Sequence, residues 1–305
     1  MMIHKHAADA PASRVAVFYG MDDESVKKID MEILEEQIEQ APKSLATFIG
    51  VDEISHKKGH NYLTLIVDQK ARRAIKLEEG RKAQSLERFF RYMGREDCRT
   101  IEAVCVDRWK PYRKAIRKWC PNAIICYDKF HIIQDCNDAV DRVRRRLISE
   151  LPKDQRQELK HCKWAILKNP DNLTDPQREK LRRIERHNRP LFRAYLLKEQ
   201  FRQFYAMRPD EHEPQERFLK RAADAFDQWC RSVMYSRLPE LKHFVKNLRK
   251  DKERKLVLNY FIHRLTNGLT EGLNAIIRSI QRRAHGFRDM AYFSLKVYQK
   301  AGIIY

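Results

Sequence analysis

T-F-I-G-V-D-E-I (residues 47–54) and A-V-C-V-D-R-W-K-P-Y (residues 103–112) decide the fold, because each carries an aspartate within or directly after a short apolar run. The first stretch begins a series of three strand candidates, at 47–54, 61–68 and 73–79, with polar turns between them. Two more strand candidates, at 101–106 and 123–127, alternate with helical patterns. Together they predict an α/β fold, a five-stranded mixed sheet with flanking helices.

Beyond about residue 130 the strand signal ends and charged amphipathic helices continue to the C-terminus. Prolines divide this part into segments of ordinary helix length. We interpret residues 150–255 as a large all-α insertion, with 45–149 as the first part of the α/β core and 256–305 as its C-terminal part. The alternative is a complete α/β domain followed by a separate helical domain, which would leave Glu271 without a catalytic role.

Residues 1–44 are predicted to be an N-terminal tail and the remnant of a helix-turn-helix. Residues 1–13 have the composition of a disordered tail. Residues 14–30 resemble the second half of a helix-turn-helix, with an apolar helix end, Gly20 in the turn and a short basic helix. A solvated helix that leads into the core explains the same pattern equally well.

The chain is strongly basic, with 62 Lys and Arg against 42 Asp and Glu and a net charge of +20. This balance favours a polyanionic partner, most often nucleic acid. The seven cysteines form no C-x-x-C pair, which favours free thiols in a reducing cytosol over disulfides or a zinc site. No apolar run approaches the roughly 20 residues of a membrane span, and residues 1–6, M-M-I-H-K-H, do not have the pattern expected of a signal-peptide core. We therefore expect a cytoplasmic protein.

Asp52 and Asp107 are the first candidate site residues. Neighbouring strands lie about 4.8 Å apart, so the two carboxylates would face each other if the first and fourth strands are adjacent. Cleavage of a phosphodiester requires a neutralised phosphate and an activated water or hydroxyl, and two divalent ions about 3.5–4 Å apart supply both. Carboxylate oxygens suit Mg²⁺, for which Mn²⁺ can substitute.

Glu271 opens an amphipathic helix near the C-terminus. At about 100° per residue, one side of this helix is an apolar stripe. The opposite, polar side carries Glu271, and a solvated surface is the alternative explanation for it. The apolar stripe consists of Leu269, Leu273, Ile276, Ile277 and Ile280. The polar side consists of Glu271, Asn274, Arg278 and Arg282.

Basic and aromatic residues are candidates for contacts with nucleic acid. A first basic group follows Glu271, and a second lies at residues 142–146; each is explained equally well as a solvated charge run. The first group comprises Arg278, Arg282, Arg283 and Arg288, joined by Asn274. Trp109, Tyr112 and Trp119 could stack on bases, but their spacing is that of a buried helix face, so core packing is favoured.

Four motifs resemble, in order, the DDE transposases of bacterial insertion sequences, and most closely the ISL-three family. They are I-G-V-D-E-I-S (49–55), V-D-R-W-K-P-Y (106–112), Y-D-K-F-H (127–131) and T-N-G-L-T-E-G-L-N-A-I-I-R-S-I-Q-R-R-A-H-G-F-R (266–288). The resemblance implies an RNase H-like fold, interrupted by helices, with a metal-binding triad of Asp52, Asp107 and Glu271. It places Asp128 and His131 beside the site as auxiliary residues; a cap on the following helix is the alternative for Asp128.

The same resemblance implies a transposase that cleaves DNA at insertion-sequence ends and joins the 3′-hydroxyl to target DNA, using two Mg²⁺ ions. It further implies a dimer or higher multimer on paired ends, in the cytoplasm of a bacterium at the nucleoid. The resemblance also implies a zinc-binding cysteine module followed by a full helix-turn-helix before the catalytic core. This chain has no cysteine before Cys98. The alternatives are a truncated, non-catalytic DNA-binding remnant and an RNase H-like nuclease or resolvase.

Overall fold

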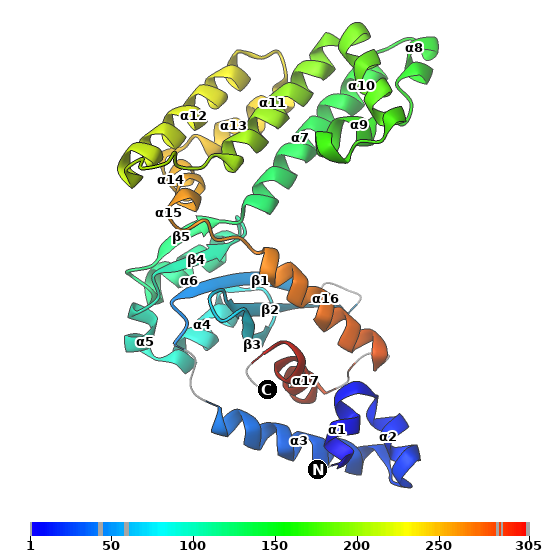
Figure 1. The fold of residues 1–305 in the computed structure, drawn as a ribbon, viewed down its shortest axis with the longest axis vertical. Coiled ribbons are helices and arrows are strands. Elements are labelled where there is room, and N and C mark those ends of the chain that lie inside the picture. Colours follow the sequence, from blue (N-terminus) through cyan, green and yellow to red (C-terminus); the bar gives the residue numbers. More distant parts are fainter. Residues whose placement is uncertain (1, 42–44, 58–60, 285–286, 288, 303–305) are drawn as a thin grey trace. The chain divides into compact units, whose positions relative to one another are not determined.

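The computed structural model describes residues 2–41, 45–57, 61–284, 287 and 289–302 (Figure 1). They form two compact units. The first unit combines Met1–Asp128 with Leu265–Tyr305, and the second is Lys129–Arg264. The helical second unit therefore interrupts the first in the sequence. Within the described ranges, no helix has both the length and the apolar character needed to cross a lipid bilayer.

A five-stranded mixed sheet forms the centre of the first unit, which confirms the predicted α/β class. The strand order is β3-β2-β1-β4-β5. β1, β2 and β3 are antiparallel neighbours, whereas β4 runs parallel to β1 and β5 runs parallel to β4. The strands are β1 (Phe48–Lys57), β2 (Asn61–Asp68), β3 (Arg73–Glu79), β4 (Ala103–Val106) and β5 (Ile124–Tyr127).

Apolar side chains join this sheet to its helices. Leu65 and Leu77 of the sheet lie in one buried cluster with Ile277 of α16 and Phe293 of α17. The hydroxyl of Tyr298 accepts a hydrogen bond of 3.0 Å from the backbone N–H of Leu77, which ties α17 to β3. The helices around the sheet are α4 (Ala83–Met93), α5 (Arg95–Arg99), α6 (Lys110–Trp119), α16 (Gly268–Arg283) and α17 (Met290–Ala301).

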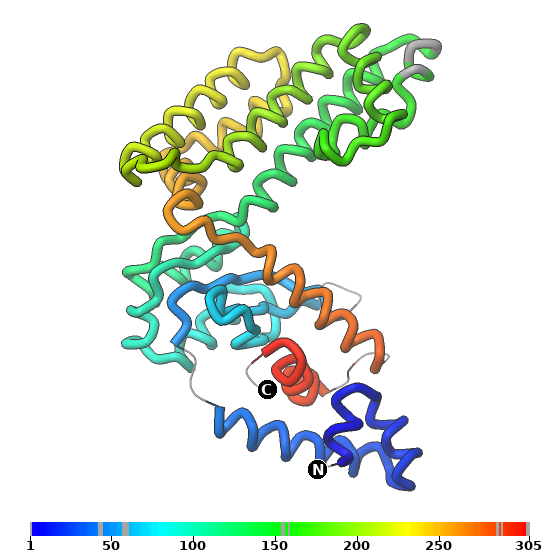
Figure 2. Tube along the Cα trace, in the orientation of Figure 1, coloured from blue at the N-terminus to red at the C-terminus, as the bar shows by residue number. Residues whose placement is uncertain are grey.

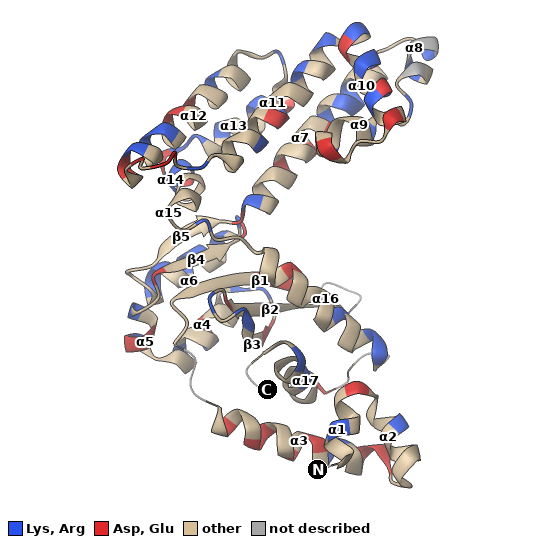
Figure 3. Cartoon of the chain, in the orientation of Figure 1, with Lys and Arg blue, Asp and Glu red and all other residues tan. Residues whose placement is uncertain are grey.

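The N-terminal segment contains three helices, α1 (Met2–Asp9), α2 (Ala12–Tyr19) and α3 (Asp23–Gln40) (Figure 2). The predicted disorder of residues 1–13 is thus wrong where the chain is described, because Ala7 of α1 packs against Val15 and Val26. Gly20 makes the turn before α3 at a φ of 65°. α3 has 18 residues and is acidic (Figure 3), so the predicted short basic helix is also wrong.

A buried ion pair fastens α1 and α3 to α17. The Asp30 carboxylate has no exposed surface and accepts hydrogen bonds from Lys296 Nζ at 2.9 Å and from the Tyr292 hydroxyl at 2.7 Å. His4 Nδ1 lies 2.7 Å from the same carboxylate, and Lys296 also donates to the carbonyl of Ala7 at 2.9 Å. Burial lowers the pKa of Lys296, and the neighbouring Asp30 opposes that shift.

The second unit is helical throughout its described residues. Its core is aromatic: Phe201 stacks on Trp229 with ring centroids 4.2 Å apart. Arg146 on α7 pairs with Glu240 on α13 at 2.7 Å. The elements are α7 (Lys129–Ser149), α8 (Lys153–Glu158), α9 (Lys163–Leu167), a 3₁₀ turn (Pro170–Asn172), α10 (Asp175–His187), α11 (Arg189–Ala206), α12 (Gln215–Tyr235), α13 (Pro239–Leu248), α14 (Asp251–Leu258) and α15 (Tyr260–His263).

Replacement of Asp30 tests the role of the buried ion pair. Asp30→Ala leaves the Lys296 ammonium buried without its carboxylate, and removal of one partner of such a pair costs about 3–5 kcal/mol. We expect a loss of this size in the free energy of unfolding, measured by urea denaturation followed by circular dichroism. Asp9→Ala is the control, because Asp9 is 74% exposed and its pair with Lys300 is worth less than about 1 kcal/mol. Equal losses in the two variants would contradict the assignment.

Candidate functional site

Asp52 lies within β1, and Asp107 directly follows β4, the parallel strand beside it. The paired residues of β1 and β4 run from Phe48 with Ala103 to Gly50 with Cys105. Asp52 and Asp107 each lie two residues beyond that last pair. Because β1 and β4 run in the same direction, the two aspartates lie at the same level along the strands, which is the arrangement expected from the sequence if the two strands are adjacent.

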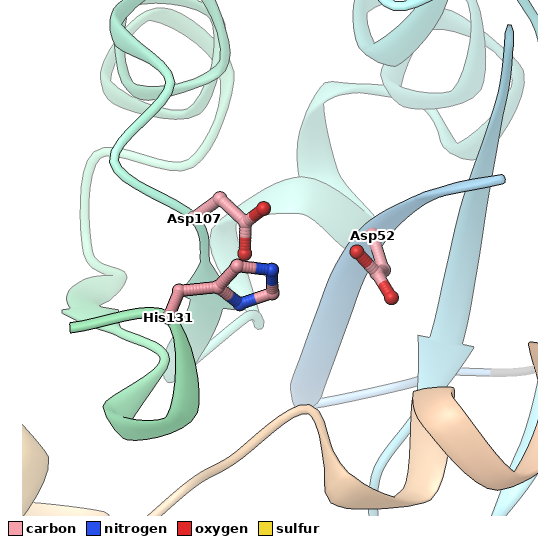
Figure 4. A group of neighbouring side chains, drawn as sticks. All are labelled: Asp52, Asp107 and His131. Carbon is pink, nitrogen blue, oxygen red and sulfur yellow. The ribbon is translucent and has the colours of Figure 1, made fainter. Parts of the chain in front are cut away.

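A candidate metal site is formed by Asp52, Asp107 and His131. One possible ligand atom from each residue lies within 4.8 Å of those from the other two. Figure 4 shows the three side chains around one space. His131 lies in the first turn of α7, three residues after Asp128. Carboxylate oxygens and imidazole nitrogens are common ligands of divalent ions in proteins, so this group is suited to hold such an ion.

The Asp52 carboxylate is held by two donors. It is only 7% exposed; its Oδ1 accepts from the backbone N–H of Glu53 at 2.8 Å, and its Oδ2 accepts from Asn274 Nδ2 at 2.7 Å. Asn274 Oδ1 is also buried and has no hydrogen-bond partner among the described residues. A hydrated divalent ion fits this arrangement, because its water ligands can donate a hydrogen bond to Asn274 Oδ1.

The start of α16 is fixed to the sheet next to Asp52. The backbone N–H of Asn267 donates to Asp128 Oδ1 at 3.0 Å, and its side-chain Nδ2 donates to the carbonyl of Val51 at 3.0 Å. The close approach leaves little room for a side chain at Gly50. A Cβ at that position would clash with the Gln69 side chain and lie 3.1 Å from Asn267 Oδ1. Asp128 is fully buried and therefore serves here to position α16.

Glu271 lies in the first turn of α16, and its side chain is exposed. It follows Asn267 by four residues and precedes Asn274 by three, which places the three residues on the same side of a helix. Both asparagines bond to β1, so Glu271 leaves the helix on the side that faces the Asp52 region. Among the described residues, the group within 4.8 Å contains Asp52 and Asp107 but not Glu271.

The buried side of α16 differs from the predicted apolar stripe. Ile276 is 39% exposed, whereas Thr270 and Asn274 are buried; the stripe is therefore wrong at Ile276. Of the predicted DNA-binding residues, Arg278 and Arg282 are exposed, and Arg283 lies 3.9 Å from Asp9. Arg288 lies outside the described residues.

Two residues near the site differ from the sequence predictions: the Glu53 carboxylate was not singled out, and the Trp109 ring was expected in the core. Burial raises the pKa of Glu53, and Asp107 and Asp52 raise it further against the opposing effect of Arg81. The only signal for it was its place directly after Asp52. Trp109 is 42% exposed, so the predicted core packing is wrong for this ring, whereas it is confirmed for Tyr112, which is 1% exposed.

Comparisons with known proteins identify the family. A transposase family model, that of the ISL3 group of DDE transposases, matches residues 49–297. The chain is 29% identical over 289 residues to the transposase of insertion sequence element IS1001 from Bordetella parapertussis. The aligned region covers 93% of this chain and 68% of that protein. It is 30% identical over 279 residues to the transposase of IS1557 from Mycobacterium tuberculosis, of which it spans 60%. The chain belongs to the ISL3 transposase family, and its sheet is the predicted RNase H-like one.

Substitution of Gly50 tests the contact between β1 and α16. Gly50→Ala forces Gln69 and the start of α16 to move, and such overpacking costs about 1–3 kcal/mol. We expect a lower melting temperature by calorimetry. Gly272→Ala in α16 is the control, because nothing lies within 4 Å of its added Cβ and an alanine favours the helix by about 1 kcal/mol. The contact is refuted if both substitutions stabilise the protein.

Removal of the Asn274 amide tests its role at Asp52. Asn274→Ala deletes the 2.7 Å hydrogen bond to the carboxylate, and loss of such an outer partner typically weakens metal binding by about 10- to 100-fold. We expect that loss for Mn²⁺, measured by isothermal titration calorimetry. The control is Asn247→Ala, which removes an exposed amide with a long bond of 3.5 Å to its own helix. Unchanged Mn²⁺ affinity in folded Asn274→Ala protein would show that Asp52 does not need this donor.

Proposed function

We propose that this member of the ISL3 transposase family is a metal-dependent polynucleotidyl transferase of the DDE type. It cleaves DNA at the ends of an insertion sequence and joins the freed 3′-hydroxyl to target DNA. Asp52, Asp107 and Glu271 would hold two Mg²⁺ ions, for which Mn²⁺ can substitute. The observation that carries the proposal is the approach of Asp52, within β1, and Asp107, directly after β4, to within 4.8 Å between possible ligand atoms, with the start of the Glu271 helix bonded to β1.

The residues of the site have separate tasks in this reaction. Divalent ions bound there supply charge neutralisation at the phosphate and a more acidic water or hydroxyl. Asp52 lies within β1 and Asp107 directly follows β4, so the sheet positions the backbone of both residues. Asn274 orients the Asp52 carboxylate, and Asp128 acts through Asn267 to place α16. The exposed Glu271 side chain is free to turn toward a bound ion, and His131 supplies an auxiliary ligand.

The exposed arginines of α16 are proposed as contacts to the DNA backbone. Arg278 and Arg282 follow Glu271 by about two and three helical turns, and Arg283 is 47% exposed. Together with Arg288 they would bind phosphates and contribute to an affinity that falls steeply with salt. Asn274 is assigned to Asp52 instead, because a side chain that is 6% exposed has little surface to offer to DNA. The active form is proposed to be a dimer or larger assembly on paired ends.

Cleavage of end-containing DNA tests the proposed function. The substrate is labelled DNA that carries the ends of the element encoding this chain, incubated with Mg²⁺ or Mn²⁺. We expect nicking and strand joining by the wild type, and losses of roughly 10³-fold in Asp52→Asn, Asp107→Asn and Glu271→Gln, since metal stabilisation is worth several kcal/mol.

Asp23→Asn and Glu35→Gln are matched controls, because both acids are exposed on α3; they should keep wild-type activity. Three outcomes would be informative. DNA binding without any cutting would identify a non-catalytic DNA-binding protein. Cutting without joined products would identify a nuclease. Loss of activity in the control variants would remove the assignment to these three residues.

A further inference from the structure

Three side chains form a cluster of one cation and two rings at the edge of the proposed catalytic site. The guanidinium carbon of Arg81 lies 4.2 Å from the centre of the Tyr62 ring and 5.6 Å from that of the Trp109 ring. Tyr62 is on β2, Arg81 follows β3, and Trp109 precedes α6. Three elements therefore contribute one side chain each.

Glu53 and Trp109 connect this cluster to the acidic residues of the site. Arg81 Nη1 is 3.8 Å from Glu53 Oε2, and Glu53 is the neighbour of Asp52 on β1. Trp109 follows Asp107 by two residues. DNA held at Asp107 would therefore come within reach of the cluster at Trp109.

The Trp109 ring is exposed and yet anchored. It is 42% exposed, and its indole N–H donates to the backbone carbonyl of Arg81 at 3.0 Å. Tyr112, about one turn later on α6, is only 1% exposed. The exposure of Trp109 is therefore not shared by the neighbouring aromatic residue of the same segment. An exposed indole that is held by its N–H loses little conformational freedom when a ligand stacks on its face.

The surroundings of the ring are basic. Arg81 has a side chain that is 43% exposed, and Lys82 and Lys110, the residues that follow Arg81 and Trp109, are exposed. Tyr62 and Arg81 also line an open hollow in which Lys76, Lys82 and Arg88 outnumber the acids Glu78 and Glu79. Aromatic faces combined with a positively charged groove are the features by which proteins bind unpaired nucleic-acid strands.

We propose that Trp109, Arg81 and Tyr62 form a stacking subsite for an unpaired nucleobase of the DNA strand beside Asp52 and Asp107. The base stacks on the Trp109 ring, and Arg81 with its neighbouring lysines contacts the adjoining phosphate. The choice of DNA as ligand rests on the proposed function. The subsite itself rests on the geometry of these three residues.

Binding of single-stranded DNA without cleavage tests the subsite. The probe is an oligonucleotide of roughly 12 nucleotides that contains 2-aminopurine, whose fluorescence falls when it stacks. A stacked base is worth about 1–3 kcal/mol, so Trp109→Ala should weaken binding by roughly 5- to 150-fold and abolish the quenching. Trp109→Phe keeps a ring without the N–H and should retain most of the affinity.

Trp164→Ala is the matched control, because Trp164 is 53% exposed and carries a lysine, Lys163, at 5.1 Å from its ring; its binding should equal that of the wild type. The subsite is overturned if the wild type does not bind the probe, if Trp109→Ala binds as well as the wild type, or if Trp109→Phe loses as much as Trp109→Ala. Quenching at Trp109 in a protein that never cuts DNA would leave the subsite standing and remove only the proposed function.

Discussion

The side chain and backbone of Asn267 join three segments that lie far apart in the chain, and the position of α16 depends on these bonds. Its partners, Val51 and Asp128, are 216 and 139 residues away in sequence. All of these groups are buried, and a buried polar group without its partner costs about 1–3 kcal/mol. These hydrogen bonds therefore fix the position of α16 on the sheet. In that position Asn274 donates to Asp52, and Glu271 lies on the side of the helix that faces β1, so the geometry of the site follows from this contact.

Much of the fold was predictable because the strands are short apolar runs bounded by turn residues. The expected strands at 61–68 and 73–79 match β2 and β3. The first and fourth strands are adjacent, which is the condition under which the sequence brings Asp52 and Asp107 together. Helix α1 was not predictable in the same way. Its stability comes from distant partners, since Ala7 packs on α2 and α3 and its carbonyl accepts from Lys296, 289 residues away. The amino-acid composition of residues 1–13 alone does not predict such long-range contacts.

Two residues of the site show where hydrophobic periodicity fails. Asn274 was assigned to a polar helix side and is buried, whereas Trp109 was assigned to the core and is exposed. Periodicity records only the hydrophobic character of each residue. The burial of Asn274 is explained by the Asp52 carboxylate, 222 residues away, and the exposure of Trp109 by its bond to the Arg81 carbonyl. In both residues a specific hydrogen bond outweighs the general tendency of the side chain.

If the site acts as proposed, its charges would make the binding of cations and of DNA depend on each other. Asp52, Glu53 and Asp107 gather at one end of the sheet with Arg81 as a nearby cation. Burial raises the pKa of Glu53, and the two aspartates add to the shift, which is the expected effect of like charges in a poorly solvated place. Phosphates brought to these carboxylates by the surrounding lysines and arginines would be repelled. A divalent cation removes that repulsion, and a phosphate in turn supplies the cation with further oxygen ligands. The acidic centre within a basic protein is therefore the arrangement expected of a site that binds both ligands together.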